Sequence, residues 1–196
     1  MFKATNKRMA GGWDIDRIYV DLGDADIIGD MFTGAIADYN RKTNAALRTE
    51  ILAAATAVTG AKNLTDTLTA FGIKAVEVGA RIDFIAVATD VWAAFANLTK
   101  DQVPWWLGGG DNLGLADGNG QAGKLGFIAD PALPKGTVVA FDKRAVNWFE
   151  RTPPVRAQAL DIAHGGVDLG VFGYYATLIS EPKAVWKTTI TDAPGV

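Results

Sequence analysis

The feature that most constrains the fold is a long run of apolar residues at helical spacing. Apolar side chains recur every three or four residues over 27–58, which is the pattern of an amphipathic helix with one buried face. Asp24 or Asp26 can accept hydrogen bonds from the free N–H groups at the helix start, and Gly60 supplies a left-handed stop. The expected helix over about 26–59 is longer than an ordinary globular helix. A rod of roughly 50 Å would organise a flattened protein.

Composition sets further bounds. The 196 residues are 49% hydrophobic and 21% charged, enough to bury a sizeable core in one or two domains. The absence of cysteine excludes a disulfide framework, a thiolate metal site and a cysteine nucleophile. A net charge of -3 argues against a protein whose affinity comes from a broad phosphate-binding surface. Lys3, Lys7 and Arg8 form the only basic-rich segment, and we expect a solvated, flexible terminus there.

Shorter elements are expected around the long helix. Residues 17–22 alternate enough to form a strand. The elements expected after the helix are a weaker helix over 64–78, a strand over 82–88, a helix over 91–98 and strands over 125–129, 137–141, 148–151, 155–161, 167–179 and 185–190. Thr89 or Asp90 caps the short helix, and Gly165 with Gly166 forms a turn between the two longest strands. A sheet with one long helix predicts an α+β protein.

Residues 99–123 differ from the rest because glycine, Asp and Asn dominate them. We expect a surface loop that cannot hold regular structure without a partner. Asp111, Asp117 and Asn119 carry oxygen donors suited to calcium, but their spacing does not follow a calcium-binding loop. No metal site is therefore predicted.

Two adjacent tryptophans, Trp105 and Trp106, lie in this loop. They provide a stacking platform in principle, but adjacent aromatics more often bury a large area, so we expect them to anchor the loop to the domain or to a neighbouring subunit. The expected subunit contacts are Trp105, Trp106, Gly108, Gly109 and Gly110.

Residues suited to catalysis are few. His164 is the only histidine, it lies beside a glycine turn, and no serine or cysteine nucleophile motif accompanies it. A dense acidic series resembles a metal site, but Asp24 and Asp26 are explained as charges that complement the helix dipole. The series comprises Asp14, Asp16, Asp21, Asp24, Asp26 and Asp30. No catalytic residue, cofactor or metal ligand is predicted.

The last third of the chain contains short motifs in a defined order. They are Asp130-Pro131-Ala132-Leu133-Pro134-Lys135-Gly136-Thr137, Asp142-Lys143-Arg144-Ala145-Val146, Val155-Arg156 and Pro182-Lys183-Ala184-Val185. This order resembles the C-terminal half of tailed-phage major capsid proteins of the HK97 fold. An earlier pattern of that family is matched by Asp83, Ile85, Val87, Asp90, Val91 and Trp92.

The resemblance implies an α+β, HK97-like capsid fold in which the long helix is the spine helix. It also implies a peripheral and an axial domain. The expected division is 1–60 as part of the peripheral domain, 61–150 as mainly axial, and 151–196 as a β-rich return segment shared between them. Family members usually carry an N-terminal arm and an extended loop before the spine helix. Few residues precede it here, so we expect either a truncated, processed or unusually short subunit, or an extended loop that is supplied otherwise. We expect no crosslink from that loop.

The resemblance also implies a function. Copies of the chain would form pentamers and hexamers of an icosahedral virion shell around double-stranded DNA, bound non-specifically and assembled in the host cytoplasm. Scaffold, portal or decoration proteins would be further partners, with no membrane, cofactor or enzymatic activity. One alternative is an encapsulin-like nanocompartment shell that encloses protein. Another is a small-molecule α/β enzyme with its site near Trp105, Trp106 and His164.

Overall fold

The structure, a computed structural model, describes residues 4–21, 27–96, 113–114, 119–122, 125–151, 154–162 and 165–190. The chain divides into two compact units, and each unit combines two segments that are distant in sequence. Unit 1 comprises Met1–Glu50 and Trp148–Leu178, and unit 2 comprises Ile51–Asn147 and Ile179–Val196. Each unit has its own hydrophobic core.

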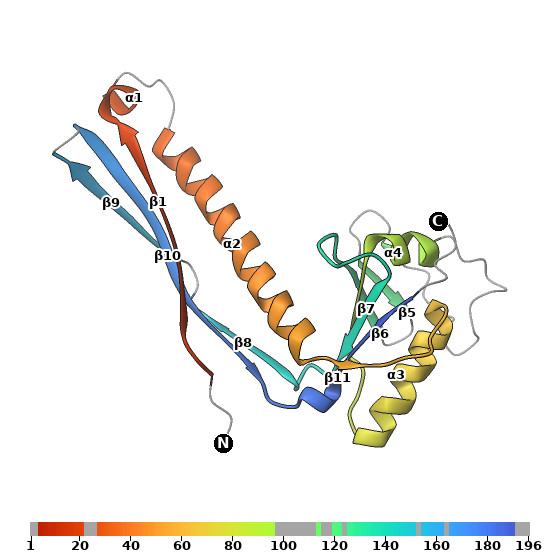
Figure 1. Ribbon diagram of the computed structural model, residues 1–196. Helices are drawn as coiled ribbons and strands as arrows, with labels where there is room; N and C mark the ends of the chain where they lie inside the picture. Colours follow the sequence, from red (N-terminus) through yellow and green to blue (C-terminus); the bar gives the residue numbers. More distant parts are fainter. Residues whose placement is uncertain are drawn as a thin grey trace. The chain divides into compact units, whose positions relative to one another are not determined.

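Unit 1 contains a four-stranded sheet centred on the long strand β10 (Gly166–Ile179). Strand β1 (Lys7–Asp16) pairs antiparallel with β10 over all 10 of its residues. Along the other edge of β10, β9 (Val155–Asp161) pairs with the first half of the strand. Strand β8 (Val146–Glu150) also pairs with β10. Figure 1 shows these strands running beside helix α2 (Ile27–Ala54).

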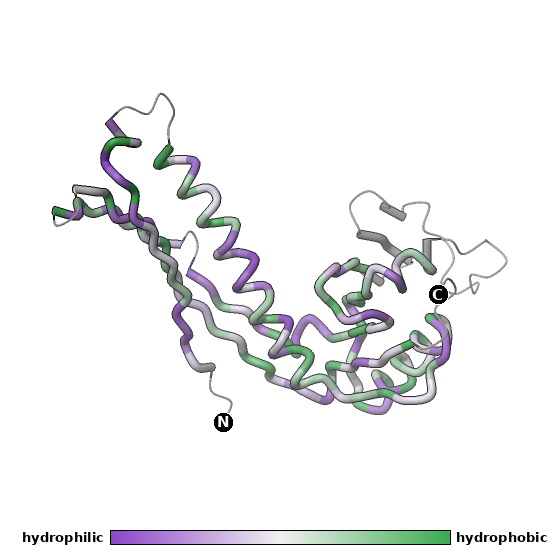
Figure 2. The backbone as a smooth tube through the Cα atoms, turned by 45° about the horizontal axis from the view of Figure 1, so that its top comes forward, coloured by the Kyte–Doolittle hydropathy of each residue, from purple (hydrophilic) through white to green (hydrophobic). Residues whose placement is uncertain are grey.

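Helix α2 covers one face of this sheet because its apolar residues share one side. Phe32, Ala35 and Tyr39 are buried in one cluster with Ile15 of β1 and Leu169 of β10. In Figure 2, hydrophobic and hydrophilic residues alternate along α2. The predicted amphipathic spine helix is therefore present, and its core face meets the sheet.

The strand expected over 17–22 is wrong. The extended segment is β1, which ends at Asp16 because its partner β10 begins opposite, at Gly166. Asp16 then accepts a 3.0 Å hydrogen bond from the Ile18 N–H, as a residue at a helix start does. The short helix α1 (Arg17–Asp21) follows.

The basic segment near the N-terminus also differs from the flexible terminus that we expected. Lys7 and Arg8 are paired residues of β1, and the Lys7 ammonium forms an ion pair with Glu50. The bond to Glu50 raises the pKa of Lys7.

The spine helix ends at Ala54, before the glycine stop expected at Gly60. Lys187 Nζ donates to the Leu52 carbonyl at 2.7 Å, which places a cation at the helix C-terminus, where it is favourable. Strand β2 (Thr56–Ala57) then pairs in parallel with β11 (Val185–Thr189). Gly60 has a positive φ of 92°, but it turns the chain after β2.

Unit 2 contains a seven-stranded mixed sheet in the order β2-β11-β7-β3-β6-β5-β4. Besides β2, its strands are β3 (Phe84–Val87), β4 (Leu113–Gly114), β5 (Asn119–Ala122), β6 (Leu125–Ala129), β7 (Thr137–Phe141) and β11 (Val185–Thr189), and a 3-10 turn, η2 (Pro182–Ala184), precedes β11. Helices α3 (Leu64–Val78) and α4 (Thr89–Ala96) contribute Phe71 and Val91 to its core.

Within the segment expected as a glycine-rich loop, the described residues form strands β4 and β5, which have the partner that such a composition needs. Leu113 pairs with Gly120, and Asn119 pairs with Ile128 of β6. Glycine and asparagine have little intrinsic strand preference, but the exposed edge of β6 supplies backbone hydrogen-bonding groups. The pairing partner, and not the local composition, decides the structure of this segment.

Most of the other expected elements agree with the structure. Strands β6, β7 and β9 have the expected bounds, and α3 continues through Gly72. Asn63 caps α3 by accepting from the Asp66 N–H, and Gly79 ends it with a φ of 70°. Gly165, with a φ of 67°, forms the expected turn before β10, although Gly166 is already part of that strand.

Candidate assembly surfaces

The predicted subunit contacts Trp105, Trp106, Gly108, Gly109 and Gly110 lie outside the described residues. His164 and the two aspartates of the rejected calcium loop, Asp111 and Asp117, also lie outside them. The candidate surfaces come from other parts of the chain.

The first surface is the face of the unit 1 sheet that points away from α2, which we call the outer sheet face. Odd-numbered residues of β1 and β10, such as Ile15 and Leu169, are buried under α2, so the even-numbered residues lie on the opposite face. The face consists of Arg8, Ala10, Gly12, Asp14 and Asp16 on β1, Asp168, Gly170, Phe172 and Tyr174 on β10, and Val155, Ala157, Ala159 and Asp161 on β9. Its middle is lined by small residues and is therefore smooth.

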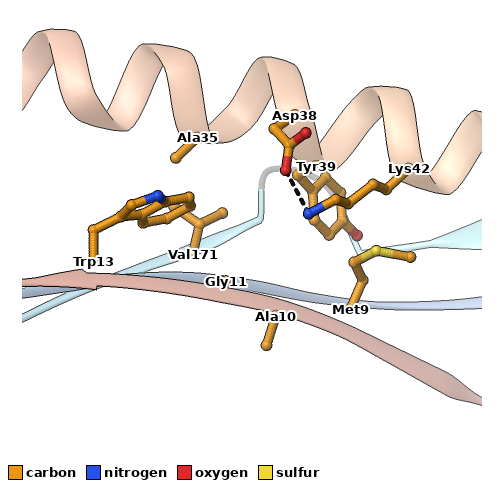
Figure 3. A pocket seen from close by; sticks show the side chains of 9 residues that line it. All are labelled: Met9, Ala10, Gly11, Trp13, Ala35, Asp38, Tyr39, Lys42 and Val171. Carbon is orange, nitrogen blue, oxygen red and sulfur yellow. Dashed lines mark ion pairs between the residues drawn. The ribbon is translucent and has the colours of Figure 1, made fainter.

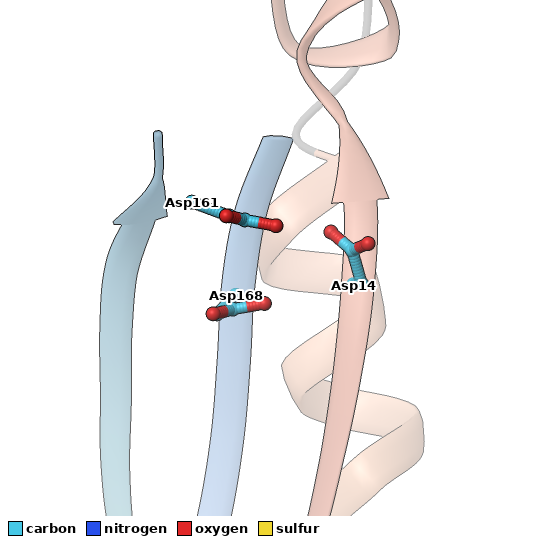
Figure 4. A group of neighbouring side chains, drawn as sticks. All are labelled: Asp14, Asp161 and Asp168. Atoms are coloured by element: carbon cyan, nitrogen blue, oxygen red, sulfur yellow. The ribbon is translucent and has the colours of Figure 1, made fainter. Parts of the chain in front are cut away.

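One end of the outer sheet face is acidic. Asp14 and Asp168 are opposite one another in the β1–β10 register, and a carboxylate oxygen of Asp161 lies within 4.8 Å of one from each of them (Figure 4). Oxygen donors at this spacing suit a hard cation, but exposed carboxylates are common without one. The acidic series identified in the sequence included Asp14 but not Asp161 or Asp168. These two lie 147 and 154 positions after Asp14, and strand pairing brings them close to it.

The second surface is an apolar patch at the same end of unit 1, which we call the tip patch. It consists of Ile18 and Tyr19 on α1 and Leu160 and Ile162 at the end of β9. Their exposed fractions are 54%, 62%, 69% and 94%. Strands β1 and β9 both end opposite Gly166, and Figure 1 shows α1 and the end of β9 at one end of the sheet. Exposed apolar clusters of this kind mark contact surfaces.

A third surface lies on α3 in unit 2. Ile73 and Val76 are exposed, with Val76 at 82%, while Phe71 and Ala75 on the opposite side of the same helix are buried. Helix α3 is therefore apolar on two sides, and only one of them contacts its own core. The exposed side is suited to contact with another molecule.

The motif from Asp142 to Val146 has a structural explanation in unit 2. The Asp142 carboxylate is buried and accepts from the backbone N–H of Arg81 at 3.1 Å and of Arg144 at 2.8 Å. The Arg144 guanidinium also donates to it at 2.6 Å. The hydrogen bonds from Arg144, with smaller help from Arg81, hold the Asp142 pKa well below its usual range. Asp142 thus joins the start of β3 to the turn after β7.

A small cavity in unit 1 lies between α2 and the sheet (Figure 3). Met9, Trp13 and Tyr39 line it, and Lys42 and Asp38 form an ion pair at its rim. The Tyr39 hydroxyl is buried and has no hydrogen-bond partner within the described part of the chain. Burial, with the carboxylate of Glu150 nearby, raises the pKa of Tyr39 to about 12. The cavity contains no group poised for chemistry near neutral pH.

Solved structures place the fold in a known class. The chain is similar to the capsid of an empty GTA particle, with a TM-score of 0.73, 12% identity, and coverage of 95% of this chain and 74% of that one. It is also similar to a chain of Mycobacterium phage Che8, with a TM-score of 0.67 and 14% identity. That match covers 93% of this chain and 70% of the phage chain. A chain of the holo-SrpI encapsulin complex from Synechococcus elongatus PCC 7942 is similar with a TM-score of 0.72 and 14% identity. That match covers 98% of this chain and 75% of the encapsulin chain. The protein therefore has the HK97-like shell fold.

The family follows from the sequence itself. The model of the phage capsid protein family matches residues 3–188, which is nearly the whole chain. No curated protein matches. The chain belongs to the phage capsid protein family, and it is a structural component of a virion shell. The predicted resemblance to HK97-fold capsid proteins is confirmed.

Proposed function

We propose that this chain is the major capsid protein of a phage head, and that its copies form the pentamers and hexamers of an icosahedral shell around double-stranded DNA. The observation that carries this proposal is the family match over 3–188. The spine helix packed on a long-stranded sheet supports it. The tip patch and the exposed side of α3 provide apolar surface that neighbouring copies would bury.

In this proposal, unit 1 is the peripheral domain and unit 2 is the axial domain. Unit 1 contains most of the spine helix and the long strands, and unit 2 contains the mixed α/β layer. The loop with Trp105, Trp106, Gly108, Gly109 and Gly110 would lie near the axis of a capsomer and contact its neighbours. This arrangement follows from the resemblance of the sequence to the family.

The proposed role is structural, without catalysis or a cofactor. Scaffold, portal and decoration proteins are proposed as further partners, and assembly in the host cytoplasm as the route. Among the described residues, no helix is long and apolar enough to cross a membrane. The alternative of a small-molecule enzyme depended on Trp105, Trp106 and His164, and the capsid family match offers it no support.

A second candidate is an encapsulin-like shell that encloses protein. The similarity to the SrpI encapsulin complex, with a TM-score of 0.72, supports this candidate at the level of the fold. The contents of the shell distinguish the two candidates, because the fold of the wall is common to both.

The test is to express the full chain, image the product by negative-stain microscopy, and analyse the contents of purified particles. Closed shells that protect double-stranded DNA from nuclease support the phage proposal. Closed shells that contain a specific protein and no protected DNA favour the encapsulin-like candidate. A strictly monomeric protein at high concentration would contradict both.

A further inference from the structure

Strand β1 forms an open edge of the unit 1 sheet. Among the described strands it pairs with β10 alone, so one side of its backbone faces no other described strand. Its register with β10 is continuous over 10 residues, and the strand contains neither a proline nor a bulge. Native proteins protect exposed edge strands with such features, because an unprotected edge pairs readily with a strand of another chain.

The charges on β1 form two blocks. Lys7 and Arg8 begin the strand, Asp14 and Asp16 end it, and residues 9–13 between them are uncharged. If two copies of this strand run antiparallel, the basic start of each lies beside the acidic end of the other. If they run parallel, like charges meet. The strand is therefore complementary to a second copy of itself in the antiparallel direction only.

Two of these four charged side chains already have contacts within the chain. Lys7 forms an ion pair with Glu50, and Asp16 accepts a hydrogen bond from the Ile18 N–H at 3.0 Å. Arg8 is exposed, and it forms no ion pair with the described residues. Its guanidinium is therefore available to a carboxylate of another chain.

Asp14 lies among like charges. It is opposite Asp168 in the β1–β10 register, and carboxylate oxygens of Asp14, Asp161 and Asp168 all lie within 4.8 Å of one another. Like charges directly opposite one another on a sheet are destabilising. Asp14 is on the edge strand, so a cation on an added strand would lie next to it and reduce this repulsion.

We infer that β1 pairs antiparallel with β1 of a second copy, about a two-fold axis at Gly11, so that Arg8 of each copy lies opposite Asp14 of the other. In this register Ala10 lies opposite Gly12, and the even-numbered residues of both strands lie on one face of the joined sheet. Such a contact uses the same surface on both copies, as two-fold contacts do. The inference deepens the proposed function, because it names one contact by which copies of a capsid protein would join.

Charge reversal tests the contact. Arg8→Asp makes both facing pairs acidic, and Asp14→Arg makes both of them basic. Each variant alone should therefore weaken self-association of the full chain about tenfold or more, as measured by sedimentation velocity. An equimolar mixture of the two variants should restore it, because each facing pair then joins one acidic and one basic side chain.

The rescue in the mixture is specific to a contact between copies. Positions 8 and 14 of one strand are about 20 Å apart, beyond the reach of an exposed charge at physiological salt. The matched control is Arg151→Asp, a cation whose N–H is bonded to Tyr174 from the other side of β10, and it should leave self-association unchanged. Unweakened single variants, or a mixture without rescue, would overturn the inference. Weakening without rescue would point to another partner for the edge, such as β9.

The register can be tested with disulfides, since the chain contains no cysteine. Ala10→Cys and Gly12→Cys, on copies with different tags, should form a disulfide-linked heterodimer when mixed and oxidised, because directly opposite residues have the Cα separation that a disulfide needs. Neither variant should crosslink alone. A Gly12→Cys homodimer would move the axis to Gly12, with Arg8 opposite Asp16, and would contradict the assigned register.

The two proposals can fail separately. If closed shells form but the mixture shows no rescue and no heterodimer is crosslinked, the contact is wrong and the proposed function stands. If rescue and crosslinking occur but no shell forms under any condition, the contact stands and the proposed function is wrong.

Discussion

At the scale of single residues, Tyr39 on α2 packs closely against Gly173 on β10. A Cβ atom at Gly173 would lie 2.2 Å from the Tyr39 hydroxyl oxygen and 2.6 Å from its ring carbon Cζ. The buried ring therefore occupies the space that a glycine leaves on the strand. This glycine is required for close packing of helix on sheet, since its backbone φ is not in the positive range.

We predict that Gly173→Ala lowers the free energy of unfolding by about 2 to 3 kcal/mol, because Tyr39 must move out of a packed core. The matched control is Gly170→Ala on the same strand, where the nearest atom to an added Cβ is 3.8 Å away. That variant should keep the stability of the natural protein. Denaturant unfolding of both variants measures the difference, and equal stabilities would show that the ring does not fill this space.

A second prediction at this scale concerns Asp142, whose pKa is held low in the folded protein. A carboxylate with a lowered folded pKa stabilises the protein above its unfolded pKa of about 3.9 and loses that contribution in acid. Asp142→Asn should cost about 1 to 2 kcal/mol at pH 7, a modest value because Arg144 is 72% exposed and solvent screens the pair. The cost should shrink when unfolding is measured below pH 4. An equal cost at both pH values would mean that ionisation of Asp142 is irrelevant.

At the scale of elements, helix α2 depends on its contact with the sheet. Phe32 is 8% exposed, lies in the unit 1 core, and has the Arg156 guanidinium 5.6 Å from the centre of its ring. Phe32→Ala should lower the unfolding free energy by about 3 to 5 kcal/mol through lost burial and a new cavity. Met31→Ala, at an exposed neighbouring position, should change it by less than about 0.5 kcal/mol. If thermal unfolding shows the two variants to be alike, Phe32 does not lie on the buried side of the helix.

How well the sequence predicted each element follows from where its stabilising partners lie. The periodicity of α2 is local, so the helix could be predicted, although its end could not. That end depends on Lys187 and on pairing with β11, more than 130 positions away. The strand expected over 17–22 failed for the same reason, because residue 166 of β10 decides where β1 stops. Local pattern gives the type of an element, and distant partners give its limits.

At the scale of the whole molecule, the candidate surfaces were largely beyond prediction. The order of the motifs predicted the family. Each motif alone is weak, but several of them in one defined order are specific. The tip patch and the acidic cluster combine residues from β1, α1, β9 and β10, and no local spacing relates them. The predicted contacts near Trp105 and Trp106 stay a prediction, because those residues lie outside the described part of the chain.

Assembly should depend on the tip patch. Replacing Leu160 and Ile162 together by Ser should change the unfolding free energy of the subunit by less than about 1 kcal/mol, because both side chains are exposed. The same change should reduce the yield of capsomers and shells on size-exclusion chromatography, since apolar contact area is lost. Gln158→Ser, an exposed change on the same strand, is the control and should assemble normally. Normal assembly of the double variant would exclude the tip patch as a contact.

The pairing of β1 with β10 has a consequence for the protein during its synthesis. Ile15 lies opposite Val167, so about 150 residues must be translated before the first strand meets its partner, and this takes roughly 10 to 30 s at bacterial rates. Throughout that interval the apolar side of the spine helix has no sheet to cover it. The nascent chain therefore exposes the apolar side of this helix early and covers it late, and transiently exposed apolar surface of this kind favours aggregation during folding.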